Sequence, residues 1–123
     1  MVEKIKDFVD LVAWRYGHEF VIDVYKITKD FPKCEVYGIT SQLRRAAASI
    51  TCNIAEGFSR FSYKDKARFY YNSRGSISEC QNCLLISRDV GYLDQENAEK
   101  LLLKADKIRQ ILNGLIRSTE AQI

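Results

Sequence analysis

The stretch QLRRAAASITCNIAEG, from Gln42 to Gly57, decides the fold that we predict for this chain. Three alanines and a serine follow one another from Ala46 to Ser49. A helix that faces only solvent has no need of four small side chains in succession, whereas a helix whose neighbour approaches its backbone closely does. The stretch therefore predicts a helix that packs tightly against a second helix.

The segments around this stretch repeat apolar residues at three- and four-residue steps, the pattern of helices with one buried face. The pattern predicts helices over residues 4–31, 40–58, 62–90 and 94–118, with no strand. We expect N-caps at Thr40 or Ser41, at Ser62 and at Asp94, and a C-terminal cap at Gly91. Helices joined by short loops lie antiparallel, so the predicted fold class is all-α, an up-down-up-down four-helix bundle.

A glycine interrupts the middle of the predicted third helix. Gly75 lies between Ser73 and Ser78, and a glycine inside a helix costs about 1 kcal/mol relative to alanine. Close contact with another helix offsets such a cost, and the alanines of the second helix are the obvious partner. We therefore expect the segment Ser73–Ser78 to face Ala46–Ser49 at short range.

The length and composition are typical of one globular domain, which we expect to span residues 1–123. Hydrophobic residues make up 46% of the chain and charged residues 28%. The first ten residues carry charges throughout, so we expect no signal peptide. The longest uncharged run, Ala46–Ala55, is half of the roughly twenty residues that a membrane span needs. We therefore expect a soluble, cytoplasmic protein with no membrane partner.

Several motifs together resemble the four-helix-bundle family encoded in intervening sequences of bacterial 23S ribosomal RNA genes. The motif Q-L-R-R-A-A, from Gln42, followed by N-I-A-E-G, from Asn53, is the most specific of them. The other matching segments are Leu11..Trp14, Val24–Thr28, Phe31-Pro32, Tyr37–Ser41, Ser49-Ile50, Arg74–Ser76, Glu79 and Gly91–Leu93. The resemblance covers essentially the whole chain. One departure is Thr51-Cys52, where the family often has proline and serine.

The resemblance implies an antiparallel four-helix bundle that assembles into a ring-like homo-oligomer, often a pentamer. The family's biochemical role is poorly defined, and its gene location suggests association with ribosomal RNA. The bundle also resembles accessory proteins of diversity-generating retroelements, which bind nucleic acid and a reverse transcriptase. A likeness between folds carries little functional weight by itself.

Polar residues within the matched motifs form the first candidate site. They are Arg44, Arg45, Asn53, Glu56, Arg74 and Glu79. We expect Glu56 to lie near Arg74, and Glu79 near Arg44 or Arg45, across the seam of the second and third helices. Paired charges at a seam form a structural network, because unpaired buried charges cost several kcal/mol. The alternative is a ligand or RNA site at the end of the bundle.

The second candidate site is the stretch FSRFSYKDKARFYYNSR, from Phe58 to Arg74. Residues 39–91 carry a net charge of +4, from eight basic and four acidic side chains. The basic residues of the stretch are Arg60, Lys64, Lys66, Arg68 and Arg74. Basic groups contact phosphates, and the interleaved aromatic rings can stack on unpaired bases. The alternative is that the aromatic residues fill the core or a subunit interface, as we also expect for Trp14.

The cysteines indicate neither a metal site nor a catalytic site. Cys80 and Cys83 have C-x-x-C spacing on a predicted helix, but zinc needs two further ligands. Cys34, Cys52 and the lone His18 show no suitable spacing. We therefore expect no metal, no cofactor and no enzymatic activity. Two functions stay open: a homo-oligomer that contacts RNA, and a scaffold that docks another protein.

Overall fold

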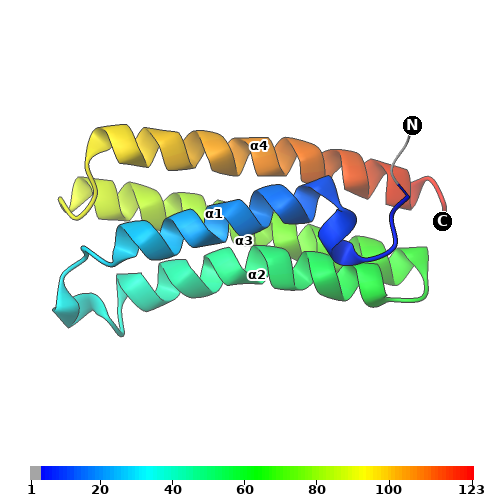
Figure 1. Cartoon of the computed structure of the whole chain (residues 1–123), viewed down its shortest axis with the longest axis horizontal. Coiled ribbons are helices and arrows are strands. Elements are labelled where there is room, and N and C mark those ends of the chain that lie inside the picture. The colour runs from blue at the N-terminus through cyan, green and yellow to red at the C-terminus, as the bar shows by residue number, and fades with distance from the viewer. Residues whose placement is uncertain (1–3) are drawn as a thin grey trace.

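The computed structural model describes residues 4–123, which form four helices and no strand. The helices are α1 (Val12–Thr28), α2 (Ile39–Ser59), α3 (Tyr63–Asp89) and α4 (Gln95–Glu120). Two 3-10 turns, η1 (Phe8–Asp10) and η2 (Lys33–Glu35), precede α1 and α2. Consecutive helices run in opposite directions (Figure 1), which confirms the predicted all-α, antiparallel four-helix bundle.

Short links gather at the two ends of the bundle (Figure 1). Residues 60–62 join α2 to α3 at the end where α4 also finishes, which we call the α2–α3 end. The α1–α2 and α3–α4 links lie at the opposite end. There the Tyr92 hydroxyl donates a hydrogen bond of 2.7 Å to Glu35 Oε2, which ties the two links together.

The helix ends confirm three predicted caps and overturn one. Ser62 and Asp94 accept hydrogen bonds from backbone N–H groups in the first turns of α3 and α4. Gly91 follows α3 with a φ of 88°, a conformation that favours glycine. The prediction of Thr40 or Ser41 as a cap was wrong, because α2 begins at Ile39, one residue earlier. A carboxylate oxygen of Glu35 lies 3.4 Å from the Ile39 nitrogen instead.

The first predicted helix, over residues 4–31, was too long at both ends. Leu11 is extended, with φ −72° and ψ 131°, and separates η1 from α1. Asp7 and Asp10 form a capping box around η1, so the polar start of the chain makes its own short turn. At the other end α1 stops at Thr28, three residues before the expected Phe31. Apolar periodicity alone did not show these breaks.

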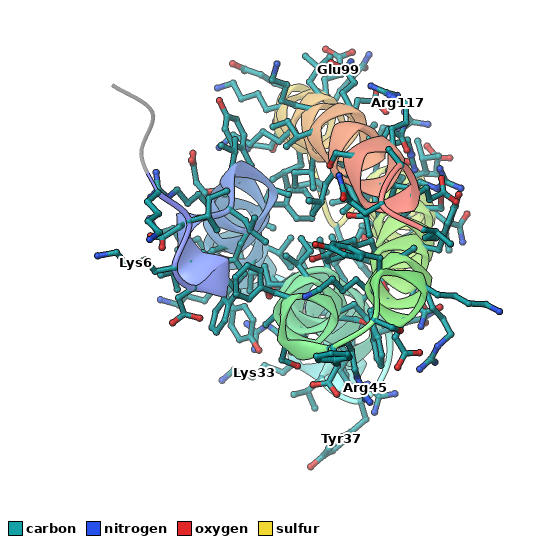
Figure 2. All side chains as sticks on the ribbon, turned by 90° about the vertical axis from the view of Figure 1, so that its right-hand side faces the viewer. Lys6, Lys33, Tyr37, Arg45, Glu99 and Arg117 are labelled. Carbon is teal, nitrogen blue, oxygen red and sulfur yellow. The ribbon has the colours of Figure 1, made fainter. Side chains whose placement is uncertain are left out.

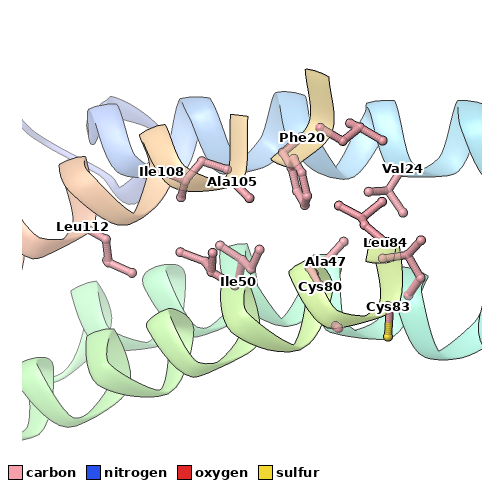
Figure 3. Close-up of a cluster of buried hydrophobic side chains, with 14 of the residues drawn as sticks. Phe20, Val24, Ala47, Ile50, Cys80, Cys83, Leu84, Ala105, Ile108 and Leu112 are labelled. Atoms are coloured by element: carbon pink, nitrogen blue, oxygen red, sulfur yellow. The ribbon is translucent and has the colours of Figure 1, made fainter. Parts of the chain in front are cut away.

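Buried side chains from all four helices meet along the bundle axis (Figure 3). Phe20 and Val24 come from α1, Leu84 from α3, and Ala105 and Ile108 from α4, each at most 1% exposed. Burying a large apolar side chain stabilises the fold by about 1.5–3 kcal/mol, so this layer provides most of the driving force. Within residues 4–123, no helix is both long and apolar enough to cross a membrane.

The seam between α2 and α3 is the most extensive contact between helices. Ala46 and Ala47 are buried, and so is Ser73, whose hydroxyl bonds to the Ile50 carbonyl of α2. The expected contact between Ala46–Ser49 and Ser73–Ser78 is confirmed at Ser76, whose hydroxyl lies 2.9 Å from that of Ser49. It was wrong for Gly75, which is exposed and has no atom of another helix within 4 Å of the position where a Cβ would stand.

Candidate nucleic-acid interface

Hydroxyl groups hold the α2–α3 seam together. The Ser73 hydroxyl donates to the Ile50 carbonyl at 2.7 Å, and the Ser76 hydroxyl lies 2.9 Å from the Ser49 hydroxyl. Asn53 donates to both the carbonyl and the hydroxyl of Ser49. Small hydroxyl side chains therefore connect the two helices across the seam.

The charged residues of the matched motifs do not form the expected network across this seam. Arg44 donates to the Thr28 hydroxyl at 2.8 Å and stacks on Tyr25, so it contacts α1. Glu56 pairs at 2.6 Å with Arg60, which directly follows its own helix. The expected pairings of Glu56 with Arg74, and of Glu79 with Arg44 or Arg45, are absent from the described residues.

Arg45 and Glu79 are exposed, and Figure 2 shows Arg45 on the outside of the bundle. The reason is geometric. The small residues of α2 and α3 point into the seam, so the long charged residues beside them point outward. Asn53 donates to Ser49 on its own helix, and Ser49 in turn contacts Ser76 across the seam.

The basic cluster begins at Arg60, the first residue of the α2–α3 link. Its guanidinium lies 4.6 Å from the ring centre of Phe69, and that of Arg68 lies 4.5 Å from the same ring. Arg60 Nε is buried without a hydrogen-bond acceptor. Two positive charges are therefore held at one partly buried ring at the α2–α3 end.

Lys64 and Arg68 are the most accessible cations of the cluster. Both are exposed and stand four residues apart on the first turns of α3, so they share one side of the helix. Arg68 pairs loosely with Asp65 at 3.4 Å. Lys64 forms no ion pair within the described residues. An exposed pair of this kind contributes at most about 1 kcal/mol, so both cations are free to contact another molecule.

Lys66 and Arg74 have structural contacts instead. Lys66 was predicted as a basic residue of the nucleic-acid site, but its ammonium donates to the Phe58 carbonyl at 2.6 Å, near the end of α2. Arg74 donates to Asn113 on α4 at 3.0 Å and stacks on Tyr71. The structure therefore brings Arg60, Lys64 and Arg68 together at the α2–α3 end and assigns the other two to packing.

The aromatic residues divide between core and surface. Tyr70 is 2% exposed and belongs to the core, whereas Phe61 is fully exposed in the link. Tyr63 and Tyr71 are about half exposed. Trp14, expected as an anchor, packs partly buried against the core and stacks on His18 with ring centres 4.6 Å apart. Exposed rings and accessible cations thus share the α2–α3 end.

The cysteines of the C-x-x-C pair are part of the core. Neither Cys80 nor Cys83 has exposed surface, and burial raises the pKa of Cys80 to about 12. A thiol with such a pKa stays protonated at neutral pH and is a poor nucleophile and a poor metal ligand. Within residues 4–123, no three cysteine, histidine or acidic side chains gather in a way that could hold a metal ion.

One contact of the site was missed by sequence reasoning. Asn113, which accepts a hydrogen bond from Arg74, carried no motif signal. Its partner is 39 residues away in the chain, so no local pattern could have indicated it. Ser49, in contrast, belongs to the stretch Ala46–Ser49 that was expected to face Ser73–Ser78, and its hydroxyl lies 2.9 Å from that of Ser76.

A groove with an apolar floor runs between α1 and α4. Ile27, Leu101 and Leu103 line it, with a volume of about 480 Å³, and Leu103 is 69% exposed. Lys26 and Lys100 also line the groove. Sequence reasoning did not single out this surface, because the exposed leucine lies in an otherwise regular amphipathic pattern.

Comparisons with known proteins agree with the motifs. A comparison with curated proteins finds no match. Among solved structures, the chain is similar to a protein of unknown function from the S23 ribosomal protein family of Bacteroides thetaiotaomicron VPI-5482. The TM-score is 0.77 at 20% identity, over 85% of this chain and 98% of the other, which is a likeness of fold. The family model described as 23S rRNA-intervening sequence protein matches residues 9–114, and the chain belongs to this family.

Proposed function

We propose that the protein is a non-enzymatic, cytoplasmic homo-oligomer that binds RNA through the α2–α3 end of its bundle. The observation that carries this proposal is the cluster of Arg60, Lys64 and Arg68 beside exposed aromatic rings. Cations of this kind neutralise phosphates and release condensed counterions, a contribution that does not depend on sequence. The family description, which refers to 23S rRNA, makes ribosomal RNA the first candidate target.

Assembly would strengthen this binding. A closed ring, with five subunits as the proposed count, repeats the basic cluster once per subunit. Binding of one cluster then raises the local concentration of RNA at the next, so weak single contacts become a strong joint one. Exposed apolar side chains on more than one helix, among them Tyr16, Ile86 and Leu103, offer surface for such an assembly.

The test is an anisotropy titration of labelled RNA with the wild-type protein and the double variant Lys64→Gln/Arg68→Gln. Lys66 is left unchanged because it contacts the end of α2. Affinity should fall, and the slope of log affinity against log salt should flatten by about 1.4, since each lost phosphate contact on a single strand contributes about 0.7. The melting temperature should stay nearly the same, because both side chains are exposed.

The matched control is Lys29→Gln/Lys33→Gln. It removes the same charge from exposed residues at the opposite end of the bundle. RNA affinity of this control should stay within about twofold of wild type. An equal loss in both variants would show that net charge and not the α2–α3 end governs binding. Absence of wild-type binding at low salt would refute the RNA-binding function.

The second candidate function is a scaffold that docks another protein, and the α1–α4 groove favours it. Its floor exposes Leu103, and its lysines fit an acidic, apolar segment of a partner. Leu103→Lys should then abolish capture of that partner, whereas Leu85→Lys, an exposed leucine on α3, should not. A captured protein that both variants lose equally, or neither loses, would not belong to this groove.

A further inference from the structure

Phe61 is exposed far beyond what the fold requires. Its side chain is 100% exposed in the link between α2 and α3, and it belongs to neither the core nor the residues packed against it. Burial of a phenylalanine is among the larger stabilising contributions to a fold, and Phe61 makes none. A large ring held entirely in solvent on a short link is therefore available to another molecule.

Cations surround this ring in the sequence and at the surface. Arg60 precedes it, and Lys64 follows three residues later on the first turn of α3. Lys64 lines both surface grooves at this end, one of which includes Phe61 and the other Arg68. The ring thus stands beside positions where phosphates can be neutralised.

The opposite end of the bundle provides a comparison. Tyr37 is 96% exposed in the link before α2, as prominent as Phe61. However, the corresponding residues 36–44 contain one basic residue, Arg44, and no acidic one. Residues 60–68 contain four basic residues and one acidic residue. Exposure is therefore common to both ends, but the density of basic residues in the sequence is higher around Phe61 than around Tyr37.

Resting on the RNA-binding function above, we propose that Phe61 is a stacking site for an unpaired base of single-stranded RNA. Lys64 and Arg68 then contact the phosphates that flank this base. An aromatic face accepts any base, because every base has a flat face, and positive side chains track the backbone. In a duplex the bases are already stacked on one another and cannot reach the ring. The site therefore selects single strands over duplexes.

The experiment compares Phe61→Leu, Phe61→Tyr and Tyr37→Leu with the wild type. Each protein is titrated with a single-stranded RNA that carries the fluorescent base 2-aminopurine, and with a duplex of the same sequence. Loss of one stacked base should weaken single-strand binding at least about fivefold in Phe61→Leu. Phe61→Tyr, which keeps the ring, and Tyr37→Leu should bind within about twofold of wild type.

Two readouts separate this proposal from the RNA-binding function. The wild type should quench 2-aminopurine, and Phe61→Leu should not, even at saturating protein. If Phe61→Leu binds and quenches like wild type while Lys64→Gln/Arg68→Gln loses affinity, the stacking site is wrong and the phosphate contacts stand. If no RNA binds at low salt, both proposals fall.

Light scattering tests the role of Phe61 in assembly. Phe61→Leu should keep the oligomeric state and the melting temperature of the wild type, because the ring has no contact within the subunit. A change of subunit number together with unchanged quenching would assign the ring to a protein contact and overturn the stacking site. Equal weakening of duplex and single-strand binding in Phe61→Leu would overturn it as well.

Discussion

The ring of Tyr70 on α3 lies directly over the backbone of Gly57 on α2. A Cβ at Gly57 would stand 2.7 Å from Tyr70 Cε1 and 3.0 Å from the Cβ of Phe69. Atoms in folded proteins do not approach this closely without a shift. The last residue of the motif N-I-A-E-G is therefore glycine because α3 crosses α2 at this point.

The first prediction is that Gly57→Ala destabilises the protein. Tyr70 is 2% exposed and held by its neighbours, so the ring cannot swing away without disturbing the core. Overpacking of this kind costs about 1–3 kcal/mol, more than the helical preference of alanine returns near a helix end. Chemical denaturation should show a lower midpoint. A midpoint at or above that of the wild type would show that α3 can move aside.

The second prediction is the opposite result for Gly75→Ala. Gly75 lies inside α3 and has open space where a Cβ would stand. Alanine restricts the unfolded chain and favours the helix, so the free energy of unfolding should rise by up to about 1 kcal/mol. The pair of variants makes the same chemical change in two surroundings. Destabilisation by Gly75→Ala would indicate that another subunit approaches α3 at this residue.

The contrast shows which part of the fold a sequence can reveal. Apolar spacing and cap residues such as Ser62 and Asp94 are local signals, and they located α3 and α4 to within two residues. The direction of each side chain depends on helical phase. Ser73 and Gly75 are two residues apart, about 200° around a helix, so they could not both face α2. Treating the segment as one surface caused the error at Gly75.

For the candidate site, too, the sequence indicated the region but not the direction of each side chain. The density of cations and rings between residues 58 and 74 pointed to the α2–α3 end, where the structure places Arg60, Lys64 and Arg68. It could not show which cations are accessible, because lysine and arginine side chains are long enough to reach several partners. Lys66 reaches a carbonyl eight residues away, and Arg74 reaches a side chain 39 residues away. Such contacts depend on the distances between helices, which the sequence does not contain.

The third prediction concerns Lys66. Its ammonium donates to the Phe58 carbonyl near the end of α2, where carbonyls lack partners within the helix. Lys66→Met keeps most of the side chain but removes the donor, so it should lower the free energy of unfolding by about 1 kcal/mol. Lys64→Met, two residues earlier and exposed, is the matched control and should change it little. Equal effects of both variants would contradict this role of Lys66.

The fourth prediction concerns Ser73. Its side chain has no exposed surface and its hydroxyl donates to the Ile50 carbonyl across the seam. Ser73→Ala should cost about 1 kcal/mol through the lost hydrogen bond. Ser73→Leu should cost more, because the larger side chain forces two closely packed backbones apart. Thermal melting measures both, with Ser78→Leu on the exposed side of α3 as the control. A smaller loss for Ser73→Leu than for Ser73→Ala would contradict the tight seam.

The fifth prediction is a loss of stability at high pH. Burial raises the pKa of Cys80 from 9.0 to about 12, and the pKa of Tyr70 from 10.0 to about 12. Between pH 9 and 12 the unfolded chain loses these protons while the folded chain keeps them, so the folded state binds more protons. The contribution of these two groups to the free energy of unfolding is therefore fully present below pH 9. It falls as the pH rises, by up to about 1.4 kcal/mol per pH unit for each group. Urea denaturation from pH 8 to 11 measures this slope.

Cys80→Ala should be less stable than the wild type at pH 8, since it leaves a cavity. It should nevertheless lose less stability between pH 9 and 10, where Tyr70 contributes little. Equal slopes for Cys80→Ala and wild type in that interval would show that the Cys80 thiol is not the group that titrates.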